Sequence, residues 1–249
     1  MGDLFTQSHA ISLCMLMTSA QTEGAMCDLE LVCDGQTIRV HKLVVCLQSL
    51  VLRAACTGLF EEASGRYEMK DCEFASVQRM VDFFYNGDYD AKASDETESS
   101  EEMLIHVAMF TLADKYIIDG LRTLSQIKFK AVVTKQEKPS VMPQYVKLVY
   151  DLECESSKRL RDVVIEAVRL RVAALPSDSD IKKTLEGLMD DIPDFAKDLA
   201  MSYIEKPQYT TWLGDYEKPA NPTTTAPNFP RVSPWNFAEA ARRKRGIAR

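Results

Sequence analysis

The sequence contains little glycine, little histidine and no closely spaced cysteine pair. Its ten glycines are scattered along 249 residues and form no glycine-rich phosphate loop. The three histidines, His9, His41 and His106, lie far apart, and no two cysteines form a CxxC motif, so we expect no metal site. No catalytic or cofactor motif is recognisable. We therefore predict a non-catalytic protein that needs no metal ion or cofactor.

Seven cysteines leave one catalytic alternative open. They stand at positions 14, 27, 33, 46, 56, 72 and 154, without the regular spacing of a secreted disulfide framework. Free cysteine behaves as a small hydrophobic residue, so buried thiols in a reducing compartment are the simplest interpretation. A catalytic pair would need one thiol within hydrogen-bonding distance of His41 or His106, in a cleft. We do not expect that arrangement.

The sequence also lacks long apolar runs and an excess of positive charge. No run approaches the roughly 20 apolar residues that cross a bilayer. The apolar segment 11–17 is short, contains Ser12 and follows Asp3, which is not typical of a signal peptide. A net charge of -7 gives no electrostatic reason to expect binding to nucleic acid. We expect an intracellular protein, in the cytoplasm or nucleus, whose partners are proteins.

Apolar periodicity predicts an α+β domain in the first third of the chain. Residues 6–20 indicate an amphipathic helix, and the alternating segments 29–33 and 37–40, joined by Asp34-Gly35, predict a β-hairpin. Two short helices should follow, with Ser49 as the N-cap of the second. A half-exposed strand is expected at 66–70. A further helix carries one apolar stripe, made of Phe74, Val77, Met80, Val81 and Phe84.

The remainder of the chain is predicted to be helical, with one loop and a tail. The acidic, serine-rich segment 90–102 should be a solvated loop. The next helix is expected to turn one face to the core, formed by Met103, Leu104, Val107, Ala108, Thr111 and Leu112. Another helix begins near Tyr116, and about four more reach Ile204. Six of the ten prolines lie in segment 207–234, which predicts an extended, mobile linker.

Two charged residues stand beside otherwise apolar segments. Asp28 precedes the first strand and Lys42 opens the helix after the hairpin. The hairpin can bring them together, so an ion pair is feasible although fourteen residues separate them. The alternative is that both are solvated surface charges. If the pair is buried, the loss of one partner would cost about 3–5 kcal/mol.

Several short sequence phrases occur in a particular order. They are Cys27-Asp28-Leu29, Ile38-Arg39-Val40-His41-Lys42, Gln48-Ser49, Phe60-Glu61-Glu62, Phe84-Tyr85-Asn86-Gly87-Asp88-Tyr89 and Ala113-Asp114-Lys115-Tyr116. Together they resemble the BTB/POZ domain, in the form found in the large set of fungal BTB proteins. The occurrence of both VHK and FFYNGDY, in that order and spacing, is more specific than either phrase alone. The resemblance implies a BTB/POZ fold, which is a small β-sheet flanked by helices.

The resemblance also implies a function. BTB domains homodimerise and recruit partners, and many attach to a cullin scaffold as substrate adaptors of ubiquitin ligases. Asp28 and Lys42 fall where the family carries a charged pair near the dimer interface, although a plain structural pairing is the alternative. Phe60 and Glu62 match the hydrophobic-x-Glu loop motif of cullin-binding members, with Phe60 as the apolar anchor. A phenylalanine at this place also fills the domain's own core in many relatives.

The predicted organisation has four parts. They are an N-terminal helix or arm at 1–24, the BTB/POZ domain at 25–132, an all-helical extension at 140–204 and a mobile, proline-rich linker with a basic C-terminal helix at 205–249. No kelch repeat, MATH domain or zinc finger follows the domain in this sequence. The extension resembles a shortened form of the BACK-like helices that often follow BTB domains, and its role is unassigned.

A basic cluster near the C-terminus suggests a second functional hypothesis. It consists of Arg242, Arg243, Lys244 and Arg245. Its composition is that of a nuclear import signal, with a solubilising helix end as the alternative. The first hypothesis is therefore a dimeric adaptor that recruits partners, with a cullin among them. The second is a nuclear scaffold or transcription-associated interaction protein without a ligase role.

Overall fold

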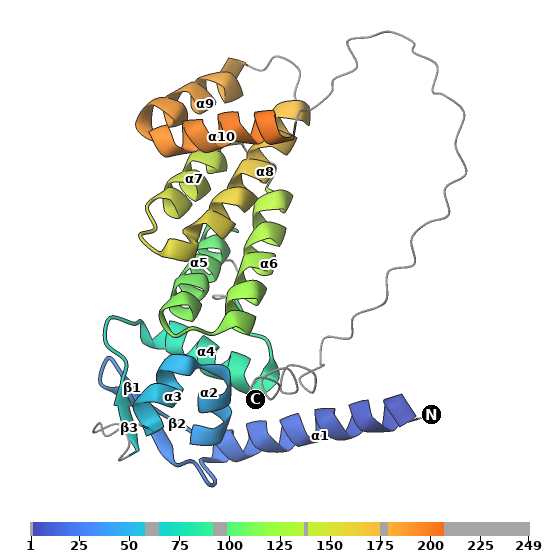
Figure 1. Cartoon of the computed structure of the whole chain (residues 1–249), viewed down its shortest axis with the longest axis vertical. Helices are drawn as coiled ribbons and strands as arrows, with labels where there is room; N and C mark the ends of the chain where they lie inside the picture. Colours follow the sequence, from blue (N-terminus) through green and yellow to red (C-terminus); the bar gives the residue numbers. More distant parts are fainter. Residues whose placement is uncertain (1, 58–64, 92–98, 137–138, 175–178, 207–249) are drawn as a thin grey trace, which may run out of the picture. The chain divides into compact units, whose positions relative to one another are not determined.

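The structure is a computed structural model that describes residues 2–57, 65–91, 99–136, 139–174 and 179–206 (Figure 1). The chain divides into one unit at 1–207 and a second at 208–249. All of the described residues belong to the first unit. Among these residues, no helix is both long and apolar enough to cross a membrane.

A sheet of three strands, in the order β2-β1-β3, forms one side of the domain. Strand β1 (Leu29–Cys33) pairs antiparallel with β2 (Gln36–Val40) and parallel with β3 (Arg66–Glu68). Asp34 and Gly35 both adopt positive φ angles, 49° and 73°, as a two-residue hairpin turn of this hand requires. The predicted hairpin is confirmed, and so is the short strand near residue 67.

Four helices accompany this sheet: α1 (Gly2–Glu23), α2 (Lys42–Gln48), α3 (Leu50–Thr57) and α4 (Phe74–Asn86). Ser49 caps α3 as predicted, because its Oγ accepts a hydrogen bond from the backbone N–H of Leu52 at 3.1 Å. The same hydroxyl donates to the carbonyl of Tyr116 at 2.7 Å, which fixes α3 against the far end of α5. In the predicted apolar stripe of α4, Val77, Met80, Val81 and Phe84 are buried and Phe74 is half-buried; the helix ends at Gly87.

The remaining described elements are helical. They are α5 (Ser99–Lys115), α6 (Asp119–Lys135), α7 (Met142–Tyr150), α8 (Lys158–Ala174), α9 (Ser179–Asp191) and α10 (Pro193–Glu205), with 3-10 turns η2 (Pro139–Val141) and η3 (Glu155–Ser157). Figure 1 shows α5 and α6 as an antiparallel pair that leads from the sheet-containing part to α7–α10. This order confirms the α+β class with a helical continuation.

Two hydrophobic cores share the helix pair α5 and α6. The first core contains the sheet, α2–α4 and residues such as Met109 and Leu121. The second contains α7–α10 together with Met103, Phe110 and Phe129. Each of the two shared helices contributes buried side chains to both cores. The extension therefore packs directly on helices that also complete the first core.

Two details of α5 differ from the sequence prediction. The helix already begins at Ser99, so the end of the predicted acidic loop is helical; Glu101 and Glu102 lie in its first turn, where the helix dipole favours negative charge. Leu104, Ala108 and Thr111 were expected in the core but are exposed. The reason is that α5 packs between two cores, so its buried residues lie on two sides rather than on one stripe.

Candidate protein-interaction surfaces

The predicted pair Asp28 and Lys42 is brought together by the hairpin. The backbone N–H of Lys42 donates to Oδ1 of Asp28 at 2.7 Å. Lys42 is the first residue of α2, and the N-cap residue His41 offers no side-chain cap. The Asp28 carboxylate therefore caps α2 from the start of β1, at the end of the helix where its dipole favours negative charge. A role of these two residues at a dimer interface stays a prediction.

Cys27 lies beside His41, a contact that the sequence pattern does not indicate. The Cys27 sulfur is 4.0 Å from Nε2 of the buried His41 ring. Nε2 also lies 3.0 Å from the carbonyl of Ala25, and Nδ1 lies 2.7 Å from the hydroxyl of Tyr85. Burial raises the pKa of the Cys27 thiol, although Arg39 acts in the opposite direction. Both ring nitrogens of His41 thus already have an oxygen partner, so the contact is better explained as packing that holds the start of β1 against α2 and α4.

The N-terminal helix carries exposed apolar side chains. Ile11, Leu13, Met15 and Leu16, here called the α1 segment, are 54% to 68% exposed. At about 100° per residue these side chains lie around much of the helix circumference. The predicted helix is therefore confirmed, but its apolar residues do not form a single buried stripe. Its C-terminal end is held by Gln21, whose Nε2 donates to the Arg39 carbonyl at 3.1 Å. Figure 1 shows α1 extending away from the sheet.

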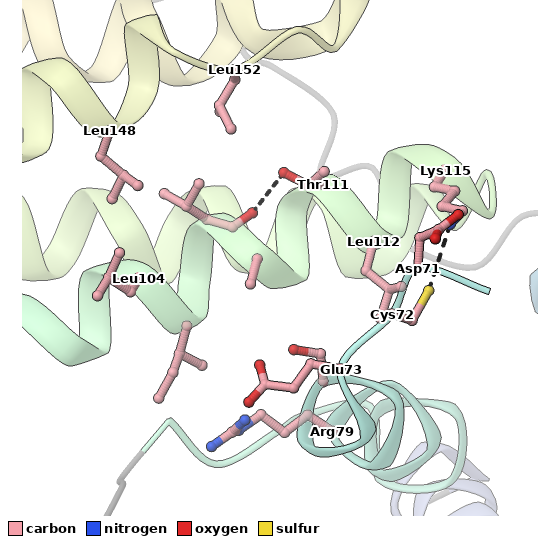
Figure 2. A pocket seen from close by; sticks show the side chains of 14 residues that line it. Asp71, Cys72, Glu73, Arg79, Leu104, Thr111, Leu112, Lys115, Leu148 and Leu152 are labelled. Carbon is pink, nitrogen blue, oxygen red and sulfur yellow. Dashed lines mark hydrogen bonds between the residues drawn. The ribbon is translucent and has the colours of Figure 1, made fainter. Parts of the chain in front are cut away.

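An open groove of about 460 Å³ lies between α5, the end of α7 and the loop before α4 (Figure 2). Its floor is formed by Leu104, Ala108 and Thr111, the exposed row of α5. Leu148 and Leu152 line the opposite wall. We call this feature the α5 groove. Exposed apolar side chains of α5, the helix that contributes to both cores, therefore lie in one groove with apolar side chains of the extension.

The other end of the α5 groove is polar. Asp71, Cys72 and Glu73 line it from the loop before α4, with Arg79 on α4 and Lys115 at the end of α5. Figure 2 shows Lys115 reaching across to this loop. The sequence pattern did not predict the groove. Its walls come from segments that are tens of residues apart, and the α5 residues on its floor were expected to be buried.

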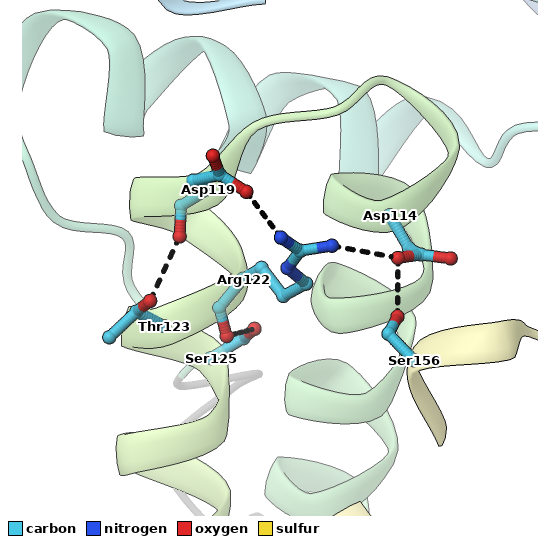
Figure 3. A network of polar contacts seen from close by, with 6 residues as sticks. All are labelled: Asp114, Asp119, Arg122, Thr123, Ser125 and Ser156. Atoms are coloured by element: carbon cyan, nitrogen blue, oxygen red, sulfur yellow. Dashed lines mark hydrogen bonds and ion pairs between the residues drawn. The ribbon is translucent and has the colours of Figure 1, made fainter. Parts of the chain in front are cut away.

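A polar network joins the two cores (Figure 3). The guanidinium of Arg122 on α6 binds Oδ1 of Asp114 on α5 at 3.1 Å and also binds Asp119. The hydroxyl of Ser156 in η3 donates to the same Asp114 oxygen. Asp114 and Arg122 are only about one fifth exposed, so solvent screens this contact incompletely. The network attaches the η3 turn, between α7 and α8 of the extension, to the α5 and α6 pair.

The remaining predicted site residues lie outside the described residues. Phe60 and Glu62 fall in segment 58–64, and the basic cluster Arg242 to Arg245 falls in segment 207–249. Their roles therefore stay predictions.

Comparison with known proteins agrees with the resemblance. The family model of the BTB/POZ domain matches residues 17–132. The Drosophila melanogaster sex determination protein fruitless is 25% identical over 88 residues, which are 32% of this chain and 8% of fruitless. The longitudinals lacking protein-like of the same organism is 31% identical over 110 residues, 43% of this chain and 76% of that protein. The chain thus spans a small part of fruitless and most of the second relative.

Solved BTB domains are also similar to this chain. The BTB domain of zebrafish PATZ1 has a TM-score of 0.42 and 14% identity, and covers 50% of this chain and 94% of its own. The BTB domain of human gigaxonin has a TM-score of 0.37 and 20% identity, with coverages of 47% and 87%.

This chain belongs to the BTB/POZ domain family. BTB/POZ domains are protein-interaction modules and are generally not enzymes. The domain matched here is therefore a protein-binding module, and the prediction of the family is confirmed.

Proposed function

We propose that this protein is a non-catalytic adaptor that forms a homodimer through its α1 segment and recruits partner proteins. The observation that carries the proposal is the exposure of Ile11, Leu13, Met15 and Leu16 around one helix. Large apolar side chains exposed around a helix are normally covered by another surface, and here a second copy of the chain would cover them. Burial of each large apolar side chain contributes about 1.5–3 kcal/mol. Leu43 and Leu47 on α2 offer further exposed apolar area.

Light scattering of the full chain at tens of micromolar tests this proposal. We expect a dimer, and we expect Leu13→Glu combined with Leu16→Glu to yield a monomer because two charges would be buried in the interface. Leu170→Glu on α8 is the matched control, since Leu13 and Leu170 are both 54% exposed. A monomeric parent protein, or a dimer that survives the double substitution, would rule out the α1 segment as the dimer contact.

We further propose a cullin scaffold as one partner, with Phe60 as the anchor and Glu62 as its charged neighbour. The support is the Phe60-Glu61-Glu62 motif, which matches the hydrophobic-x-Glu loop of cullin-binding BTB domains. The purified chain should bind the N-terminal region of a cullin, and Phe60→Ala should weaken binding by at least about 1–2 kcal/mol. Glu61→Ala, at the variable position of the motif, should leave the affinity unchanged. If the parent chain does not bind the cullin, the cullin proposal is eliminated.

A nuclear scaffold without a ligase role is the second candidate. The basic cluster Arg242, Arg243, Lys244 and Arg245 favours it. A fluorescent fusion of the full chain should accumulate in the nucleus, and replacement of all four residues by alanine should abolish that accumulation. Replacement of Lys182 and Lys183, which are exposed on α9, is the control for a general loss of positive charge. Unchanged localisation of the four-residue variant would dismiss the import role.

A further inference from the structure

Cys72 occupies an unusual position at the polar end of the α5 groove. Its partly exposed thiol belongs to the loop between β3 and α4 (Figure 2). The Lys115 ammonium lies 3.7 Å from the Cys72 sulfur, and the Tyr116 hydroxyl lies at the same distance. The thiol itself faces the carbonyl of Lys70 at 3.3 Å. Lys115 donates to that carbonyl at 2.7 Å, which holds the ammonium beside the sulfur.

Two groups beside the sulfur can donate hydrogen bonds to it or to an oxygen bound to it. Burial raises the pKa of Tyr116 far above its usual range, and the hydrogen bond with Cys72 adds to the shift. The phenol therefore keeps its proton and can donate to the sulfur. The ammonium of Lys115 supplies a second donor with a positive charge. Charge-assisted donors of this kind stabilise a thiolate and the oxygen of a sulfenic acid.

A second thiol lies against the same residue. Cys33, the last residue of β1, donates from its sulfur to the backbone carbonyl of Cys72 at 2.8 Å. Cys33 is 2% exposed, whereas Cys72 lines the groove. Burial raises the pKa of the Cys33 thiol, and Asp34 adds to this effect. Cys72 is thus the more accessible of the two sulfurs to a dissolved oxidant, and Cys33 supplies a second thiol in contact with the same residue.

We propose that Cys72 is an oxidation site for hydrogen peroxide and that Cys33 converts the product into a Cys33–Cys72 disulfide. In the first step the Cys72 thiolate attacks one peroxide oxygen. An S–O bond forms, the O–O bond breaks, and the leaving hydroxide takes up a proton as water. In the second step the Cys33 sulfur attacks the Cys72 sulfur. The S–S bond forms, the S–O bond breaks, and the hydroxyl leaves as water with the Cys33 proton.

Over the two steps the two thiols lose two electrons and two protons, and one peroxide molecule gains them and becomes two water molecules. The new bond ties the loop before α4 to the end of β1 and takes the Cys72 sulfur away from Lys115. Oxidation therefore changes the polar end of the α5 groove, and a dithiol reductant would restore it.

The experiment treats the full chain with limiting hydrogen peroxide, traps sulfenic acid with dimedone and blocks remaining thiols by alkylation. Digestion with trypsin and Glu-C leaves Cys33 alone in peptide 31–39 and Cys72 alone in peptide 71–73. We expect a disulfide between these two peptides. In Cys33→Ser the cross-link should disappear and a dimedone adduct on Cys72 should accumulate. Cys14, which is exposed on α1, serves as the internal comparison.

Substitution of the neighbouring lysine tests the chemistry without disturbing the core. Lys115→Met should slow the oxidation of Cys72 by about five-fold or more, because the charged donor is lost. Lys70→Met, an exposed lysine in the same loop, should not change the rate. Equal oxidation rates of Cys72 and Cys14 would overturn the proposal. So would a cross-link to a cysteine other than Cys33, or no effect of Lys115→Met.

Discussion

The hydroxyl of Tyr89 lies 2.8 Å from Nδ1 of His106, and both side chains are buried. Burial raises the pKa of Tyr89 well above its usual range, so the phenol remains a donor. Burial also lowers the pKa of His106 to about 4, and the positive charges of Lys128 and Arg79 act in the same direction. The imidazole is therefore neutral at neutral pH and shares a hydrogen bond with the Tyr89 hydroxyl through Nδ1.

Acidification should destabilise the fold through His106. Its pKa is about 4 in the folded chain and 6.5 in the reference state, so between these values the unfolded chain binds the extra proton. The free energy of unfolding should fall as the pH falls through this window, by up to about 3 kcal/mol. Urea titrations at several pH values measure this slope. His106→Gln should lose that part of the slope, whereas His9→Gln on the exposed side of α1 should keep it.

Asp28 should stabilise the fold as the cap of α2. Asp28→Ala removes the 2.7 Å bond to the Lys42 N–H and should cost about 1 kcal/mol of unfolding free energy. Asp28→Asn keeps an oxygen acceptor and should recover most of that loss. If the asparagine variant is as unstable as the alanine variant, the negative charge matters rather than the cap. Denaturant midpoints of the three proteins decide between the two roles.

The network of Asp114, Arg122 and Ser156 should couple the extension to the first core. Arg122→Met should destabilise by about 1–2 kcal/mol, because it leaves a partly buried carboxylate without its charged partner. Arg122→Met and Ser156→Ala should be non-additive, since both residues bind the same Asp114 oxygen. The exposed pair Lys130 and Glu166 is the control, and Lys130→Met should cost less than about 1 kcal/mol. Additive effects in the cycle would contradict the shared contact.

Two glycine substitutions should have opposite signs. Gly87 ends α4 with a φ of 71°, and Gly187 lies inside α9 without a positive φ; an added Cβ would meet no atom within 4 Å at either position. Gly87→Ala should destabilise by about 1 kcal/mol, because an L side chain disfavours the left-handed conformation. Gly187→Ala should stabilise by about 0.5–1 kcal/mol through helix propensity. Thermal unfolding of both variants measures the difference, and equal signs would refute the backbone explanation.

Local sequence rules were sufficient for the elements whose structure depends on neighbouring residues. Asp34-Gly35 predicted the hairpin turn because few other pairs of residues adopt positive φ angles at two successive positions. Ser49 predicted the start of α3, and the stripe from Val77 to Phe84 predicted the buried side of α4. The BTB/POZ phrases, read in order, gave the family. In each case a short stretch of chain already carries the physical constraint.

Contacts between distant segments could not be predicted in this way. The sequence alone determined the family, the hairpin, and most helices, since backbone preference and apolar periodicity act over a few residues. Only the tertiary structure decided that α5 packs between two cores and exposes Leu104 to a groove, and that Lys115 reaches the sulfur of Cys72. Those contacts depend on how whole elements pack, and the periodicity of one helix does not specify how many neighbours that helix will have.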